Sequence, residues 1–140
     1  MTARAIILTG LAILALAWAG PLPRLVRTSF AAHMALHMLV VGVGVPILAA
    51  GLALTLRRRG VRVPVVYPII ASMIDFAVIW VWHAPVLHAA SRLNPVVLTL
   101  EQACFAAAAL FVWLVALTAP PWRAHWNYSS PPCTWSCWGR

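Results

Sequence analysis

The residues in this chain best suited to metal chemistry are two histidines and two methionines in the segment HMALHM, residues 33–38. His33 and His37 are four residues apart, so in a helix they share one face, with Met34 and Met38 on the adjoining face. Imidazole and thioether side chains suit copper, and a histidine pair at this spacing can chelate one ion. The pattern predicts a copper site. The alternative is that the histidines hydrogen-bond between helices and the methionines fill packing gaps.

Several other side chains add to this candidate site. His83 is the fifth predicted metal ligand, while His88, Glu101, Cys104 and Asp75 are candidates for additional ligands or for groups that orient a ligand. Asp75 lies inside an apolar segment, where an ionisable group is costly and is therefore a functional candidate. Simpler alternatives are a solvated histidine, a carboxylate stabilised at a helix start, and a cysteine that acts as a small apolar residue.

The sequence contains no pattern of a hydrolytic or phosphate-handling enzyme. Neither a Ser-His-Asp arrangement, nor a glycine-rich phosphate loop, nor a pair of neighbouring carboxylates is present. We therefore expect no catalytic residues and no enzymatic activity.

These side chains must be positioned by membrane helices. Of the 140 residues, 64% are hydrophobic and 9% are charged. A membrane span needs roughly 20 apolar residues, and backbone in lipid must satisfy its own hydrogen bonds. The sequence predicts an all-α integral membrane bundle of about four transmembrane helices within residues 1–120. The predicted spans are residues 5–19, 30–56, 65–82 and 96–118.

Local signals place the ends of these spans. Two prolines within residues 20–23 predict a loop, and Thr28 or Ser29 is the expected cap of the second span. Pro46 removes a helical hydrogen bond and predicts a kink. Residues 121–140 form a polar tail rich in tryptophan and proline, which we expect to be irregular. Our hypothesis is that a frameshift produced this tail and truncated the protein, and gene sequencing would test it.

The positive charges predict how the chain is oriented. All ten basic residues are arginines, and they flank the apolar segments, which is typical of membrane orientation and does not indicate nucleic-acid binding. In a four-span arrangement one side carries seven arginines and the other three. The larger group is Arg4, Arg57, Arg58, Arg59, Arg62, Arg123 and Arg140. The positive-inside rule then predicts a cytoplasmic N-terminus, unless the first apolar segment is a cleaved signal peptide.

This orientation brings distant residues to one depth. The second span enters from the outer side, the third ends there and the fourth begins there. His33, His37, His83 and Glu101 are therefore all expected near the outer surface of the membrane.

At these residues the chain resembles the multi-helix CtaG-type cytochrome c oxidase assembly factors of bacteria. Residues 33–39 resemble the family segment H-M-x-x-H-M-L, and residues 46–51 resemble P-x-L-x-x-G. Residues 80–87 resemble W-x-W-H-x-P-x-L, and residues 100–105 resemble L-E-x-x-x-F. The resemblance covers residues 28–118. It implies a protein of the bacterial inner membrane that acts with oxidase subunits, with copper as the metal it handles on the periplasmic side.

The chain departs from the family pattern in two places. Family members often carry a histidine directly after the glutamate, where this chain has Gln102. If that histidine is a ligand, this chain lacks one. Family members also continue into further helices, whereas this chain ends in the polar tail.

Two other functions remain open at this stage. One is a small membrane electron carrier, with haem held between His33 or His37 and His83. The other is a structural membrane subunit without a cofactor, in which the polar residues only join helices.

Overall fold

The computed structural model describes residues 2–61, 63–64 and 66–119, and within these residues the chain is helical and contains no strand. The predicted all-α fold is confirmed. The predicted tail lies outside the described residues. The helices are α1 (Ala3–Ala19), α2 (Leu22–Leu25), α3 (Phe30–Leu39), the π-helical turn η1 (Val40–Gly44), α4 (Val45–Arg58), α5 (Val66–Trp82), α6 (Pro85–Leu93) and α7 (Pro95–Thr118).

Three helical segments are long and apolar enough to cross a membrane, and a fourth span results if the bent pair α5–α6 is counted as one. The continuous helix from α3 to α4 is one of the three, with 29 residues. Large apolar side chains such as Leu16, Ile69, Met73 and Trp80 point outward, each at least 63% exposed. Such surfaces need hydrocarbon around them, which agrees with a membrane protein.

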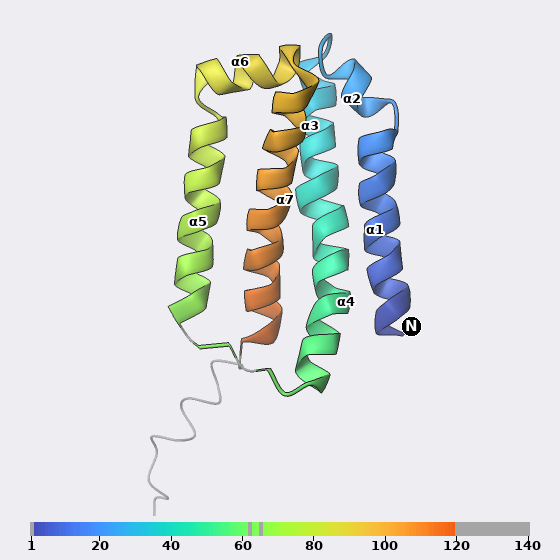
Figure 1. The fold of residues 1–140 in the computed structure, drawn as a ribbon, viewed down its shortest axis with the longest axis vertical. Helices are drawn as coiled ribbons and strands as arrows, with labels where there is room; N and C mark the ends of the chain where they lie inside the picture. The colour runs from blue at the N-terminus through green and yellow to red at the C-terminus, as the bar shows by residue number, and fades with distance from the viewer. Residues whose placement is uncertain (1, 62, 65, 120–140) are drawn as a thin grey trace, which may run out of the picture.

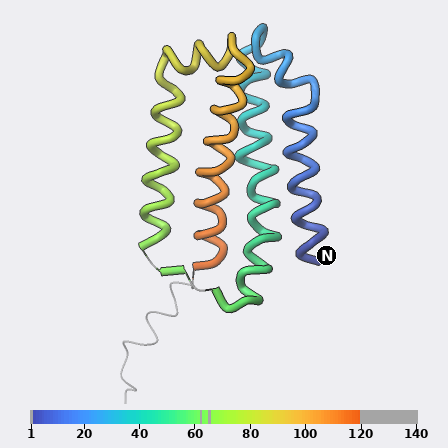
Figure 2. The backbone as a smooth tube through the Cα atoms, in the orientation of Figure 1, coloured from blue at the N-terminus to red at the C-terminus, as the bar shows by residue number. Residues whose placement is uncertain are grey.

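The long helices stand side by side in the order α5, α7, α4 and α1 (Figure 1). The short helices α2 and α6 lie across one end of this layer, which we call the α2/α6 end. Figure 2 shows that α1 starts at the opposite end, where α4 also finishes and α7 terminates. The layer therefore places the start of α3, the end of α5 and the start of α7 at the same end.

Helices α1 and α4 approach one another closely because glycines line their contact. A Cβ atom on Gly10 would lie 2.6 Å from the backbone nitrogen of Leu48. A Cβ atom on Gly51 would lie 2.9 Å from the backbone nitrogen of Ile7. Small residues at such contacts allow membrane helices to pack backbone against backbone.

The disturbance expected at Pro46 takes the form of a π-helical turn. Ser29, one of the two residues predicted to cap this span, caps α3. Its hydroxyl oxygen accepts a hydrogen bond from the backbone N–H of Ala32 at 3.2 Å. The chain then widens into η1 directly before Pro46, which occupies the first turn of α4. Proline cannot donate a backbone hydrogen bond, and a π-turn accommodates that loss inside a continuous helix.

Two short helices differ from the sequence prediction. The predicted loop at residues 20–23 is wrong in part, because Leu22–Leu25 forms α2 with proline in its first turn, a position that proline tolerates. The other is α6, which sequence reasoning missed. Ala84 is extended before Pro85, and α6 leaves α5 at 72°. A residue before proline avoids the helical region, so α5 cannot continue straight.

Candidate functional site

Four of the five histidines gather at the α2/α6 end. His33 and His37 come from α3, His83 follows the last residue of α5, and His88 lies on α6. The ring centroids of His33 and His88 are 4.9 Å apart, those of His83 and His88 are 6.4 Å apart, and those of His37 and His83 are 6.2 Å apart. We call these residues the histidine cluster. The predicted meeting of histidines from different spans is present.

Two histidines of this cluster converge with Glu101 as a metal-ligand set. His33, His88 and Glu101 place one possible ligand atom each so that all three atoms lie within 4.8 Å of one another. His33 is 1% exposed, Glu101 is 2% exposed and His88 is partly buried. We call these three residues the metal triad. It joins α3, α6 and the second turn of α7, so it depends on the way α6 folds across the bundle end.

The spacing within the metal triad suits an ion better than a direct hydrogen bond. His33 Nε2 and Glu101 Oε2 are 3.6 Å apart. This is longer than the usual N–H···O distance, and two ligands of one ion with bonds of about 2.0–2.2 Å can lie up to about 4 Å apart. Glu101 Oε2 is buried and has no hydrogen-bond partner among the described residues. A buried carboxylate oxygen in this position is costly unless it gains a partner, and a cation would provide one.

His37 and His83 form the second part of the histidine cluster, next to Phe105. The His37 ring meets the Phe105 ring edge-on at 3.9 Å between centroids, and His37 Nδ1 is buried without a hydrogen-bond partner in the described part of the chain. His83 is exposed, and its Nδ1–H donates to the Ile79 carbonyl oxygen at 2.7 Å. That hydrogen bond fixes the tautomer of His83 and leaves Nε2 free to bind a metal.

The remaining predicted site residues are not part of the metal triad. Met38 is 60% exposed and so does not share the buried face of His33 and His37, while Met34 is partly buried. Cys104 is a free, partly buried thiol one turn after Glu101. Asp75 lies in the middle of α5, eight residues before His83, which corresponds to about 12 Å along the helix axis. Among residues 2–61, 63–64 and 66–119, no ion pair to Asp75 is found.

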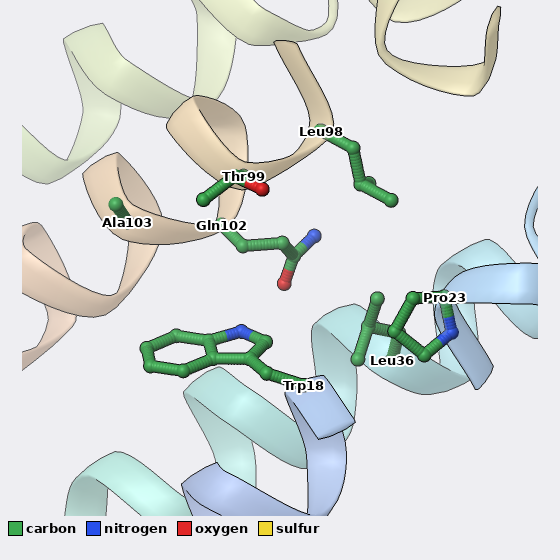
Figure 3. Close-up of a pocket in the computed structure, with 7 residues that line it drawn as sticks. All are labelled: Trp18, Pro23, Leu36, Leu98, Thr99, Gln102 and Ala103. Atoms are coloured by element: carbon green, nitrogen blue, oxygen red, sulfur yellow. The ribbon is translucent and has the colours of Figure 1, made fainter. Parts of the chain in front are cut away.

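Gln102, the residue directly after Glu101, lines a different space. Its side chain lines a cavity together with Trp18, Pro23, Leu36, Leu98, Thr99 and Ala103 (Figure 3). Neighbouring residues on a helix point about 100° apart, which explains why Glu101 joins the metal triad and Gln102 does not. None of the metal triad lines this cavity. Sequence reasoning missed the grouping of Gln102 with Trp18, because that proximity depends on how α1 packs.

The sequence of the whole chain was also compared with known proteins. A model of the caa3 cytochrome c oxidase assembly factor family matches residues 2–131. The chain belongs to this family. No curated protein and no solved structure matches it.

In this member of the Caa3_CtaG family, the residues matched by the family model include α1. They extend beyond residues 28–118, the range over which the sequence motifs resemble the family. Family membership indicates a role in the assembly of cytochrome c oxidase, and the apolar helices agree with a membrane protein. An assembly factor of this kind is generally not an enzyme.

Proposed function

We propose that this protein binds copper at the metal triad during oxidase assembly and delivers it to an oxidase subunit. The observation that carries the proposal is the convergence of His33, His88 and Glu101 from three helices, with a buried carboxylate oxygen that has no hydrogen-bond partner in the described part of the chain. A set of ligand atoms that is costly when empty favours the binding of a cation.

Copper is the ion that best fits both the ligands and the family. Imidazole nitrogens suit copper, and among divalent first-row metals copper binds a given nitrogen and oxygen site most tightly. Two imidazoles with a carboxylate favour Cu(II), whereas the thioethers of Met34 and Met38 favour Cu(I). Since Met38 is 60% exposed, we propose Cu(II) as the form bound by the metal triad.

The rest of the histidine cluster supplies a route between the metal triad and the surface. His83 is exposed and has a free Nε2, and its ring lies beside both His88 and His37. If one histidine of the cluster replaces another as a copper ligand, the ion moves along the cluster and is never without ligands. In this proposal His83 is the group that meets the receiving oxidase subunit, on the periplasmic side that the arginine distribution predicts.

The proposal is tested by metal analysis of the full-length protein purified in detergent. We expect about one copper per chain after loading and washing, with an electron paramagnetic resonance signal split by nitrogen ligands. The double variant His33→Ala/His88→Ala should lose both the copper and this signal. Met38→Leu is the matched control, because it changes an exposed methionine of the same helix and should keep both.

The same experiment decides between this proposal and the two alternatives. Copper that stays at full stoichiometry in His33→Ala/His88→Ala, or no copper in the wild-type chain, would overturn the copper proposal. A Soret absorption band that disappears in His37→Ala or His83→Ala would instead indicate the haem-binding carrier. Absence of both metal and haem would leave the structural subunit.

A further inference from the structure

The cavity that Gln102 lines is a second candidate binding site, separate from the histidine cluster. It has a volume of about 240 Å³ and lies between the end of α1, α2, α3 and the first turns of α7. Apart from Gln102, Thr99 and the indole N–H of Trp18, its wall is made by apolar groups. A cavity of about 150 Å³ can already hold a benzene molecule, so this one has room for a substituted six-membered ring.

The amide of Gln102 points into this space. Gln102 is 2% exposed, and neither its Nε2 nor its Oε1 has a hydrogen-bond partner among the described residues. Figure 3 shows the amide directed toward the centre of the cavity, between Leu98, Leu36 and Trp18. A buried amide with both atoms unpaired is unfavourable, so the cavity is built for an occupant with at least one polar group.

Water alone fits this cavity poorly. A buried water needs two to four polar partners, and here the polar atoms are few for a cavity of about 240 Å³ whose wall is otherwise apolar. A plain acyl chain also fits poorly, because it would leave the amide unpaired. The occupant that satisfies both the wall and the amide has an apolar body and one group able to accept a hydrogen bond from Nε2 or donate one to Oε1.

The shape of the cavity indicates a ring. The flat indole of Trp18 forms one wall in Figure 3, and aromatic rings pack well against such a face. The cavity is reached from the outer surface of the bundle, where Trp18 is 45% exposed and Thr99 and Ala103 are also exposed. In a chain that spans a membrane, a compound that enters here comes from the lipid phase.

We propose that this cavity binds a single-ring carbonyl or phenol compound of the membrane, the chemistry of a quinone or quinol head group, with Gln102 as its polar contact. A quinone carbonyl accepts from the Gln102 Nε2–H, and a quinol hydroxyl donates to Oε1. The ring packs against Trp18 and Leu98, and the apolar tail leaves between α1 and α7 into lipid. This site is independent of the copper proposal.

Binding is tested with the full chain in lipid nanodiscs, using a decyl-substituted benzoquinone as the probe and decylbenzene as its oxygen-free control. We expect saturable binding of the quinone by calorimetry, and about tenfold weaker binding by Gln102→Leu, the loss typical of one hydrogen bond. Decylbenzene should bind more weakly than the quinone to the wild-type chain and should not be weakened by Gln102→Leu.

A pair of tryptophan substitutions separates the cavity from general effects on the bundle. Ala103→Trp places a large side chain at the cavity wall and should abolish quinone binding, whereas Ala107→Trp, one turn along α7 and also exposed, lies outside the cavity and should preserve it.

Absence of saturable quinone binding in a wild-type chain that folds normally would overturn the proposal. Equal binding of decylbenzene and the quinone, or equal affinity in Ala103→Trp and Ala107→Trp, would overturn it as well. Copper content is measured in the same samples, so failure of this proposal is distinguished from failure of the copper proposal.

Discussion

Glu101 is the carboxylate that faces the histidine cluster at the α2/α6 end. It is one of two acidic residues in the chain, it is 2% exposed, and it faces two imidazoles. A carboxylate buried among neutral groups requires a positive partner or a proton. The bound ion that we propose supplies that partner, so the charge of Glu101 should matter for the metal more than for the fold.

At the residue scale, we therefore expect Glu101→Gln to weaken copper binding without unfolding the protein. Glutamine keeps the size of the side chain but removes the negative charge, and mutation even of residues that only orient a metal ligand costs about 10–100-fold in metal affinity. Competition titration with a copper chelator of known affinity measures the change. Asp75→Asn is the matched control, since it neutralises the other acidic residue, which lies in the middle of α5, and should leave copper affinity unchanged.

At the element scale, the position of α6 depends on Pro85. Extended Ala84 and the 72° bend turn α6 across the bundle end, which brings His88 within 4.9 Å of His33 between ring centroids. Without proline, Ala84 is free to adopt helical angles and α5 can continue straight. We expect Pro85→Ala to lower copper affinity several-fold although no ligand is changed. Wild-type copper affinity in Pro85→Ala would show that packing of α6 against α7 fixes the bend without the proline.

The contact between α1 and α4 provides a second test at this scale. A Cβ on Gly10 would meet backbone atoms of Leu48 at 2.6 and 2.8 Å, whereas a Cβ on Gly42 would meet nothing within 4 Å. We expect Gly10→Ala to destabilise the bundle by about 1–3 kcal/mol because the helices must separate. Gly42→Ala should leave stability unchanged or raise it by up to about 1 kcal/mol, because alanine favours helix. Unfolding in mixed detergent compares the two variants, and equal stability would mean that α1 shifts freely on α4.

The sequence predicts those features that depend on local chemistry or on chain direction. Apolar length predicts the spans, Ser29 predicts a cap, and the alternation of chain direction predicts that His37 and His83 meet at one end. It does not predict features that depend on packing. His88 belongs to the metal triad only because α6 bends at Pro85, and the cavity of Gln102 exists only because Trp18 reaches it from α1.

At the scale of the whole molecule, the histidine cluster lies at the end of the bundle that carries fewer arginines: Arg24, Arg27 and Arg92 lie there, against the seven predicted for the other end. The histidine cluster and Glu101 are at the α2/α6 end, and Arg57, Arg58 and Arg59 are at the other end, where α4 finishes (Figure 1). The arginine-rich end is expected in the cytoplasm by the positive-inside rule. A copper site for delivery to an oxidase subunit is then accessible from the periplasm.

This orientation can be measured with single cysteines at exposed arginines of opposite ends. In a background with Cys104, Cys133 and Cys137 replaced by serine, we expect Arg24→Cys to react with a membrane-impermeant maleimide in intact spheroplasts. Arg59→Cys, also exposed, should react only after the membrane is opened. The reverse labelling pattern would place the histidine cluster at the cytoplasmic surface. Copper loading would then have to occur from the cytoplasm, and His83 could not meet an acceptor in the periplasm, so the delivery route proposed here would be wrong even if the metal triad binds copper.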